Sequence, residues 1–287
     1  PIRHGRLKGL VLDPGQVKAV SIGRFALGQQ GVATAVTADL GRVVVAGING
    51  STAGVRSVVG TPAPADRWIL PGTGEPSNGR LVVVAALGQA AFRADALGPE
   101  GQAPLVDLES AGPGSAAVFD LGGQVGGVLV EGEGDSPLLA GRLLVPPAPA
   151  PPPEPRRDRG QGGGERREEP EEPPAPEPAD LAATGGAPTG AARWLALPAT
   201  APEGGPAALV LHNPGGATAE VTVTLLGAEG PEGSAETAEV VPGATIRLDL
   251  PGTPVAALVQ SVGGVVVPAQ VALDRRTFAV AVGVPLG

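Results

Sequence analysis

The chain has no cysteine, methionine or tyrosine among its 287 residues, and it has only two histidines, two tryptophans and four phenylalanines. The absence of cysteine excludes disulfides, thiolate metal sites and cysteine nucleophiles. Two histidines leave little material for a histidine-based metal site or a catalytic triad. Aromatic residues make up 2% of the chain, which is a poor supply for the ring platforms of carbohydrate sites. These shortages disfavour both an enzyme and a glycan-binding module.

Positive charge and long apolar runs are scarce as well. The formal net charge of −9 at pH 7 argues against nucleic acid as the main partner. No run of about 18 uncharged apolar residues occurs, so we predict no membrane-spanning segment within this sequence. We likewise predict no signal peptide at the start of this sequence. Because the first residue is Pro1, we expect a trimmed piece of a longer protein, with an anchor or export segment upstream.

Glycine and proline, in contrast, are abundant. The 46 glycines and 33 prolines make up about 28% of the chain, against a usual share of about 12%. Apolar residues reach 42% with very few aromatics, so a core would be built from valine, alanine and leucine. Pro-Gly pairs fit tight turns, because proline presets one corner and glycine accepts positive φ at the next. These pairs lie at 14–15, 71–72, 113–114, 214–215, 242–243 and 251–252.

One segment has a composition unlike the rest. Residues 146–178 contain 12 prolines, and the centre of this stretch mixes charges of both signs with glycine and no apolar residue. Such a sequence cannot bury enough surface to offset its ordering entropy. Small residues continue the stretch to Gly190. We predict a disordered Pro/Gly/charged linker over 146–190, with a Pro-rich recognition motif or a cell-wall-spanning stalk as the functional alternative.

The sequences on either side of this linker resemble each other. Each begins with Arg-Trp followed by a proline, continues with an apolar run and then reaches a turn, and these two openings hold both tryptophans. The matched pairs are 67–71 with 193–198, 80–84 with 208–211, and 86–88 with 213–215. Both flanks therefore read as copies of one unit.

A second shared element extends the match to the beginning of the chain. It consists of Pro-Gly followed by an alternating strand, and its three copies are 14–22, 113–121 and 242–250. The first segment also matches the end of the chain, in the pairs 32–36 with 255–259, 42–45 with 264–267, and 59–62 with 282–285. We predict the C-terminal half of a truncated unit over 1–64, complete units over 65–145 and 191–287, and the linker between them.

The alternation of apolar and polar residues predicts that each unit is all-β. Residues 221–225 (VTVTL) alternate strictly, as do residues 245–250 (TIRLDL), and no segment has a convincing apolar stripe of helical period. About seven short strands in about 95 residues favour tandem immunoglobulin-like antiparallel β-sandwich repeats. Trp68 and Trp194 are expected in the cores of their units. A carbohydrate-stacking role for these tryptophans is the alternative.

These residues also carry a family resemblance. The Arg-Trp and proline opening, the Asn213-Pro214-Gly215 turn and the later Pro-Gly strand ending in Asp-Leu resemble an uncharacterised exported actinobacterial family of repeated immunoglobulin-like domains. The first complete unit departs from this pattern, with Ala86-Leu87 at the turn. The resemblance implies an extracytoplasmic, often membrane-anchored location. It implies no activity and no catalytic residues.

Few residues offer chemistry. His4 and His212 have no recognisable serine and aspartate partners in the sequence, and we interpret them as exposed or turn-supporting residues, although a triad assembled in space stays open. The acids at 131, 133 and 135 alternate with glycine and faintly resemble a calcium loop, but they lack the downstream bidentate acid. An ordinary solvated hairpin loop is the favoured interpretation of this stretch.

The remaining candidates favour structural interpretations. Asp120 and Asp249 occupy equivalent places in different units, which argues against a shared carboxylate site. The glycines of 122–127 precede no helix pattern, as a phosphate-binding loop would require. The basic cluster has interleaved acids and no aromatic residues for base stacking. Its members are Arg156, Arg157, Arg159, Arg166 and Arg167. No catalytic, cofactor-binding or metal-ligating residue is therefore predicted, and no cofactor.

Three functions compete on these observations. The favoured one is a non-enzymatic extracytoplasmic structural or interaction protein that presents β-sandwich modules at the cell envelope. Its partner would be an unknown protein or a cell-wall polymer, without nucleic acid, and it would meet the membrane only through a segment outside this sequence. The alternatives are a cell-wall glycan-binding module and an accessory domain of an envelope enzyme.

Overall fold

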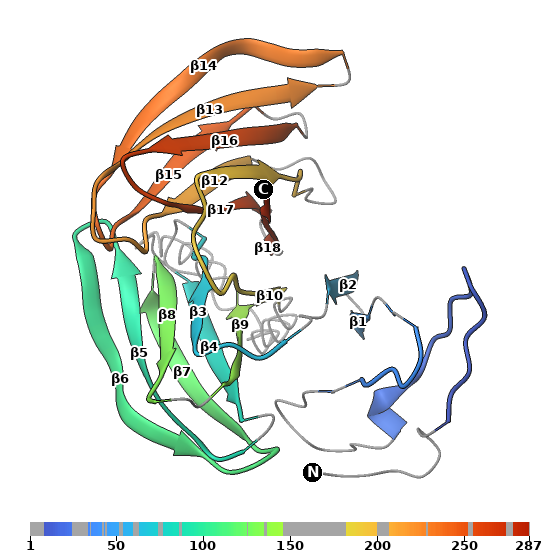
Figure 1. Ribbon diagram of the computed structural model, residues 1–287. Coiled ribbons are helices and arrows are strands. Elements are labelled where there is room, and N and C mark those ends of the chain that lie inside the picture. The colour runs from blue at the N-terminus through green and yellow to red at the C-terminus, as the bar shows by residue number, and fades with distance from the viewer. Residues whose placement is uncertain are drawn as a thin grey trace, which may run out of the picture.

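The computed structural model shows an all-β protein built from antiparallel sheets, which confirms the all-β prediction (Figure 1). Apart from a short 3-10 helix over Ile22–Arg24, the regular structure in the described part of the chain is strand. The residues described are 9–24, 34, 36–41, 43, 45–51, 54–59, 63–73, 77–85, 88–124, 126–134, 137–145, 182–199, 207–227, 229–251, 255–273 and 278–286.

The first sandwich consists of two four-stranded sheets, with the strand orders β10-β9-β4-β7 and β3-β8-β5-β6. Side chains from both sheets share one core, in which Trp68, Leu81, Phe92 and Val130 are buried. The strands are β3 (Arg67–Leu70), β4 (Ser77–Val84), β5 (Ala90–Gly98), β6 (Gly101–Ala111), β7 (Ala116–Gln124), β8 (Gly127–Gly132), β9 (Leu139–Val145) and β10 (Ala182–Gly185).

The second sandwich has sheets in the orders β14-β13-β16-β11-β19 and β15-β12-β17-β18. The two sandwiches have the same strand order. Strands β11–β17 take the places of β3–β9 in turn, β18 takes the place of β10, and β19 is added at one edge. The strands are β11 (Arg193–Ala196), β12 (Ala207–His212), β13 (Ala219–Gly227), β14 (Gly230–Val240), β15 (Thr245–Leu250), β16 (Ala256–Val262), β17 (Val267–Leu273), β18 (Phe278–Val282) and β19 (Val284–Pro285).

Two detailed sequence predictions are confirmed in these cores. Trp68 and Trp194 are each 2% exposed, so both tryptophans are core residues and not surface platforms. In β13, Val221 and Val223 are buried while the threonines between and after them are half-buried. This is the alternation that a strand with one face on the core should have.

The last strand of each sandwich passes from one sheet to the other. β10 pairs with β9, and Ala187 then exchanges two backbone hydrogen bonds with Ile69 of β3, at 2.8 and 3.0 Å. β18 likewise pairs with β17, and β19 then pairs with β11. A glycine stands at each crossing point, Gly186 or Gly283, where a Cβ atom would lie within 3 Å of neighbouring atoms. The sheet-switching strand thus closes both sandwiches.

This closure moves one predicted boundary. Residues 182–187 fall inside the predicted linker, but they form β10 and the bridge to Ile69. The sequence of β10 is Ala-Ala-Thr-Gly, which lacks the large apolar side chains that predict a strand. Backbone hydrogen bonding to β9 holds this strand in place. Residues 146–181 lie outside the described residues. β9 ends immediately before them and β10 begins immediately after them, and these two strands pair with Ala182 opposite Leu144, so in the chain order the segment is an insert in a hairpin.

The segment predicted as half a unit, 1–64, contains one hairpin among its described residues. Its strands are β1 (Ala46–Ser51) and β2 (Gly54–Val59). The Pro14-Gly15 turn is formed, with Gln16 N donating to Asp13 O at 2.9 Å. No strand follows this turn in the described residues 16–21, and a strand needs a hydrogen-bonded neighbour. β2 lies beside β10, as β10 lies beside β18.

Candidate functional site

The most extensive feature that sequence analysis missed is the contact between the two sandwiches, here called the junction. Four residues of the first sandwich are almost completely buried and belong to the packed cluster of the second sandwich's core. These residues are Ile69, Leu97, Leu129 and Ala187. Figure 1 shows the second sandwich, in yellow to red, stacked on the end of the first, in cyan to green. The apolar core of the second sandwich therefore extends onto the first sandwich, which keeps a separate core of its own.

Arg67 and Thr245 form hydrogen bonds across the junction. The guanidinium Nη2 of Arg67 donates to the carbonyl oxygen of Pro214 at 3.1 Å. The hydroxyl of Thr245 donates to the carbonyl oxygen of Leu97 at 3.4 Å. Arg67 is also held on its own sandwich, because its Nε lies 3.4 Å from a carboxylate oxygen of Glu131. These bonds add directionality to an otherwise apolar contact.

His212 ends β12 beside the junction and is 1% exposed. Its Nδ1 lies 3.0 Å from the carbonyl oxygen of Ala244 and 3.2 Å from the Thr245 hydroxyl. A carbonyl oxygen only accepts, so Nδ1 carries the proton, and the buried Nε2 has no hydrogen-bond partner among the described residues. Burial lowers the pKa of His212 to about 4; the Ala244 carbonyl raises this pKa, and the charge of Arg67 lowers it further. His212 is therefore neutral and supports the turn.

Two further buried polar side chains occupy equivalent places in the two sandwiches. Arg142 of β9 and Gln270 of β17 are each 1% exposed. Arg142 Nη1 donates to the carbonyl oxygen of Gly126 at 2.6 Å, and Gln270 Nε2 donates to that of Val255 at 2.8 Å. Gly126 immediately precedes β8, and Val255 immediately precedes β16. Burial lowers the pKa of Arg142 to about 10, which leaves it charged at neutral pH.

The carboxylates considered as candidates form ion pairs on the surface. Asp120 lies 3.0 Å from Arg80, and Asp249 lies 2.9 Å from Arg247 in the other sandwich. Both aspartates are more than 80% exposed, so the ion pairs contribute little to stability.

The acidic stretch at the end of β8 likewise forms ion pairs with arginine. Glu131 accepts hydrogen bonds from Arg93 at 2.9 and 3.2 Å, and Glu133 lies 4.0 Å from the same guanidinium. Within the described ranges, no group of three or more histidine, cysteine, aspartate or glutamate side chains could hold a metal ion. His4, Asp135 and the basic cluster at 156–167 lie outside the described residues.

The glycines of 122–127 have a packing role at their C-terminal end. A Cβ atom on Gly126 would overlap the carbonyl oxygen of Leu97, and one on Gly127 would lie 2.6 Å from the carbonyl oxygen of Leu70. Close approach of backbone to backbone is the usual reason for glycine at such places. These glycines therefore let the chain pass between β3 and β5 beside the junction.

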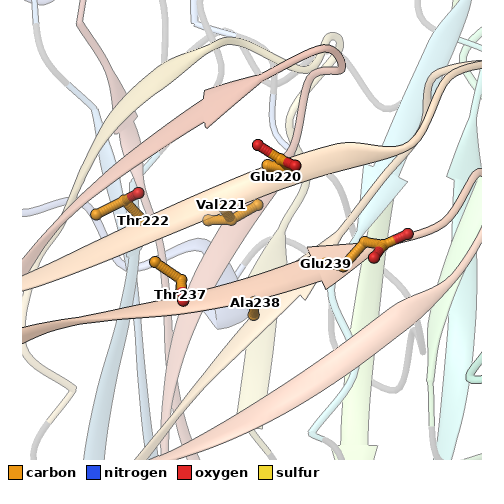
Figure 2. Close-up of a pocket in the computed structure, with 6 residues that line it drawn as sticks. All are labelled: Glu220, Val221, Thr222, Thr237, Ala238 and Glu239. Carbon is orange, nitrogen blue, oxygen red and sulfur yellow. The ribbon is translucent and has the colours of Figure 1, made fainter.

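An open depression lies on the outer strands of the second sandwich, between β13 and β14 (Figure 2). Glu220 stands directly opposite Glu239, and Thr222 directly opposite Thr237. Like charges placed opposite each other on neighbouring strands repel. The depression is lined by residues of these two strands alone, and its two carboxylates belong to no group of three acids that could hold a metal ion among the described residues. It offers no enclosed binding site.

The correspondence of β9 with β17 could have been found from one sequence signal. Arg142 and Gln270 interrupt otherwise apolar strands, and aligning these two polar residues would have matched β9 with β17. The predicted alignment of the turns at 86–88 and 213–215 shifts by one residue. Ala85, not Ala86, is the equivalent of Asn213, because each exchanges two backbone hydrogen bonds with the turn that precedes β7 or β15, at 2.6 to 3.2 Å.

In the part of the chain that the structure describes, no helix has the length and hydropathy needed to cross a bilayer.

Comparisons with known proteins add little. No family model matches the chain, and no curated protein matches it. One solved structure, described as "Crystal Structure of Thermotoga maritima 1070", aligns with 34% of this chain and 97% of its own, at 19% identity and a TM-score of 0.27. A likeness of this size carries no conclusion about fold or function.

Proposed function

We propose that this chain is a non-enzymatic, extracytoplasmic structural or interaction protein that presents immunoglobulin-like β-sandwich repeats at the cell envelope. The observation that supports the proposal most directly is the junction. Ile69, Leu97 and Leu129 pack into the core of the second sandwich, so the modules are held end to end as one body. A rigid body of this kind presents its outer strands and hairpins in a fixed geometry to a partner.

The use of the polar side chains supports the same proposal. His212, Arg142 and Gln270 are buried and bonded to backbone carbonyls, while the surface acids Asp120 and Asp249 pair with arginines. Each of these residues has a role in holding strands and turns. A glycan-binding function would need platforms other than Trp68 and Trp194, since both are buried. The extracytoplasmic location rests on the sequence resemblance alone.

The rigid presentation can be tested by the rotational correlation times of the two sandwiches, measured by NMR relaxation on the whole chain. We expect one common value, because residues of the first sandwich pack into the core cluster of the second. Leu97→Ser should give the two sandwiches different correlation times, since Leu97 packs on the second sandwich's core cluster. The matched control is Leu108→Ser in β6 of the same sandwich, where the side chain is 66% exposed. Independent tumbling of the unaltered chain would contradict the proposal.

The location can be tested in the producing cells. Protease added to intact cells should degrade an epitope-tagged chain, whereas a cytoplasmic marker should survive. Chemical crosslinking of the same cells should then join the chain to envelope components. Degradation that requires membrane disruption would refute the extracytoplasmic part of the proposal and leave the rigid presentation standing.

A further inference from the structure

The end of the second sandwich carries an apolar patch whose counterpart in the first sandwich is buried in the junction. Strand pairing identifies the equivalent residues. Ile69 stands opposite Leu129 and bridges to Ala187. In the same way, Leu195 stands opposite Leu258 and pairs with Val284. Leu97 and Leu226 both precede the hairpin glycines that end β5 and β13. We call Leu195, Leu226, Leu258 and Val284 the end patch.

Burial differs systematically between these equivalent residues. Ile69, Leu97, Leu129 and Ala187 are between 0 and 6% exposed. Leu195, Leu226 and Leu258 are half-buried, and Val284 is 49% exposed. Figure 1 shows the reason: the β5–β6 hairpin lies at the junction, whereas the β13–β14 hairpin lies at the free end of the second sandwich. The end patch is a junction surface without its covering module.

In the junction, a surface of the second sandwich covers Ile69, Leu97 and Leu129. The first sandwich has an equivalent of that covering surface, and this equivalent is exposed. In the junction, the turn before β15 of the second sandwich buries Ala244 and Thr245, at 1% and 7% exposure. The turn before β7 is built in the same way. Ala85 N donates to Ser115 O at 3.2 Å, as Asn213 N donates to Ala244 O at 3.1 Å. Gly114, Ser115 and Ala116 of this turn are exposed.

We propose that the end patch binds the turn around Ser115 and Ala116 of a second copy of this chain, so that copies associate head to tail through a repetition of the junction. This inference rests on the proposed function, because it names a partner for the presented modules. The occupant is chosen because the chain itself carries both surfaces, one uncovered at each end of the two-sandwich body. Arg193, at the place of Arg67, is exposed beside the patch and supplies the equivalent guanidinium.

The contact between copies should be weaker than the junction within one copy. Ala116 stands where Thr245 donates its hydroxyl to Leu97 O, so one crossing hydrogen bond is lost. The junction also forms between modules joined by a few residues after Ala187, which gives an effective concentration in the millimolar range. Because the two surfaces differ, the contact is heterologous and does not close at the dimer. Association should therefore grow with concentration into open chains.

The predicted head-to-tail association can be tested by analytical ultracentrifugation of the 287-residue chain at concentrations from about ten micromolar to about one millimolar. The weight-average mass should rise past that of two chains. Leu226→Glu should weaken association by at least about a hundredfold, because a carboxylate would be desolvated in the contact. Val262→Glu is the matched control on the same sandwich. Val262 is 72% exposed outside the patch, and its variant should associate like the unaltered chain.

A second variant tests the other surface and the polarity of the contact. Ala116→Arg should also abolish growth, while thermal melting verifies that each variant is folded. Mixing Leu226→Glu with Ala116→Arg should restore dimers and nothing larger, since one intact end patch and one intact turn remain. A chain that stays monomeric throughout, or association that either variant leaves unchanged, would overturn the inference. The common correlation time of the two sandwiches would survive that result, so it would leave the proposed function standing.

Discussion

Single buried polar residues in this protein satisfy backbone groups where strands end and turns begin. His212 is the clearest case, because its Nδ1 bonds to Ala244 O while its Nε2 is buried without a partner among the described residues. A proton added to Nε2 would have no acceptor and would face the positive charge of Arg67. The cost of this protonation belongs to the folded state alone, so folding is linked to pH.

The stability of the second sandwich should fall with acidification through His212. Its pKa is about 4 when folded against about 6.5 when unfolded, so the unfolded chain binds the proton first. Stability is therefore complete above about pH 6.5 and falls by about 3 kcal/mol as the pH drops to about 4. Denaturant melts of the unaltered chain and of His212→Asn, between these pH values, measure the difference.

The asparagine variant is the control because its side-chain amide can still donate to Ala244 O without titrating. Its stability should change less over the same range than that of the unaltered chain, and the remaining change reports the surface carboxylates. Parallel pH profiles for the two proteins would contradict a buried neutral His212.

At the scale of elements, the sheet-switching strand depends on glycine. A methyl group at Gly283 would lie 2.8 Å from Pro268 Cγ and 3.2 Å from Trp194 Cε3. We expect Gly283→Ala to destabilise the second sandwich by about 1–3 kcal/mol, the usual cost of overpacking. Urea denaturation followed by the combined fluorescence of Trp68 and Trp194 measures the loss. Gly216→Ala is the matched control, because nothing lies within 4 Å of its added carbon, and an equal loss in both variants would contradict the steric account.

The elements that sequence predicts are those with a strong side-chain signal. β13 and β15 were predicted because alternating valine, isoleucine and leucine mark one buried face. β10 was missed because Ala182–Gly185 carries almost no apolar side chain, and its place is decided by the unpaired edge of β9. The junction was missed for a related reason. Alternation identifies the face that a strand buries, but it does not show that Leu97, at a strand end, meets another module.

At the scale of the whole molecule, the inserted segment 146–181 changes which parts of the chain make one folding unit. The first sandwich is complete only when β10 pairs with β9 and Ala187 bonds to Ile69. These elements follow the insert in sequence. A spacer between two independent modules would instead leave everything before it able to fold alone.

Two fragments distinguish these arrangements. Fragment 1–190 carries β10 and Ala187, and fragment 1–162 does not; both have Trp68 as their single tryptophan. We expect fragment 1–190 to be more stable by about 2–4 kcal/mol, because several backbone hydrogen bonds contribute about 1 kcal/mol each. Urea denaturation followed by Trp68 fluorescence measures this difference. Adding a peptide of residues 179–190 to fragment 1–162 should restore the lost stability by supplying β10 and Ala187 as a separate chain, whereas equal stability of the two fragments would contradict the inserted-hairpin topology.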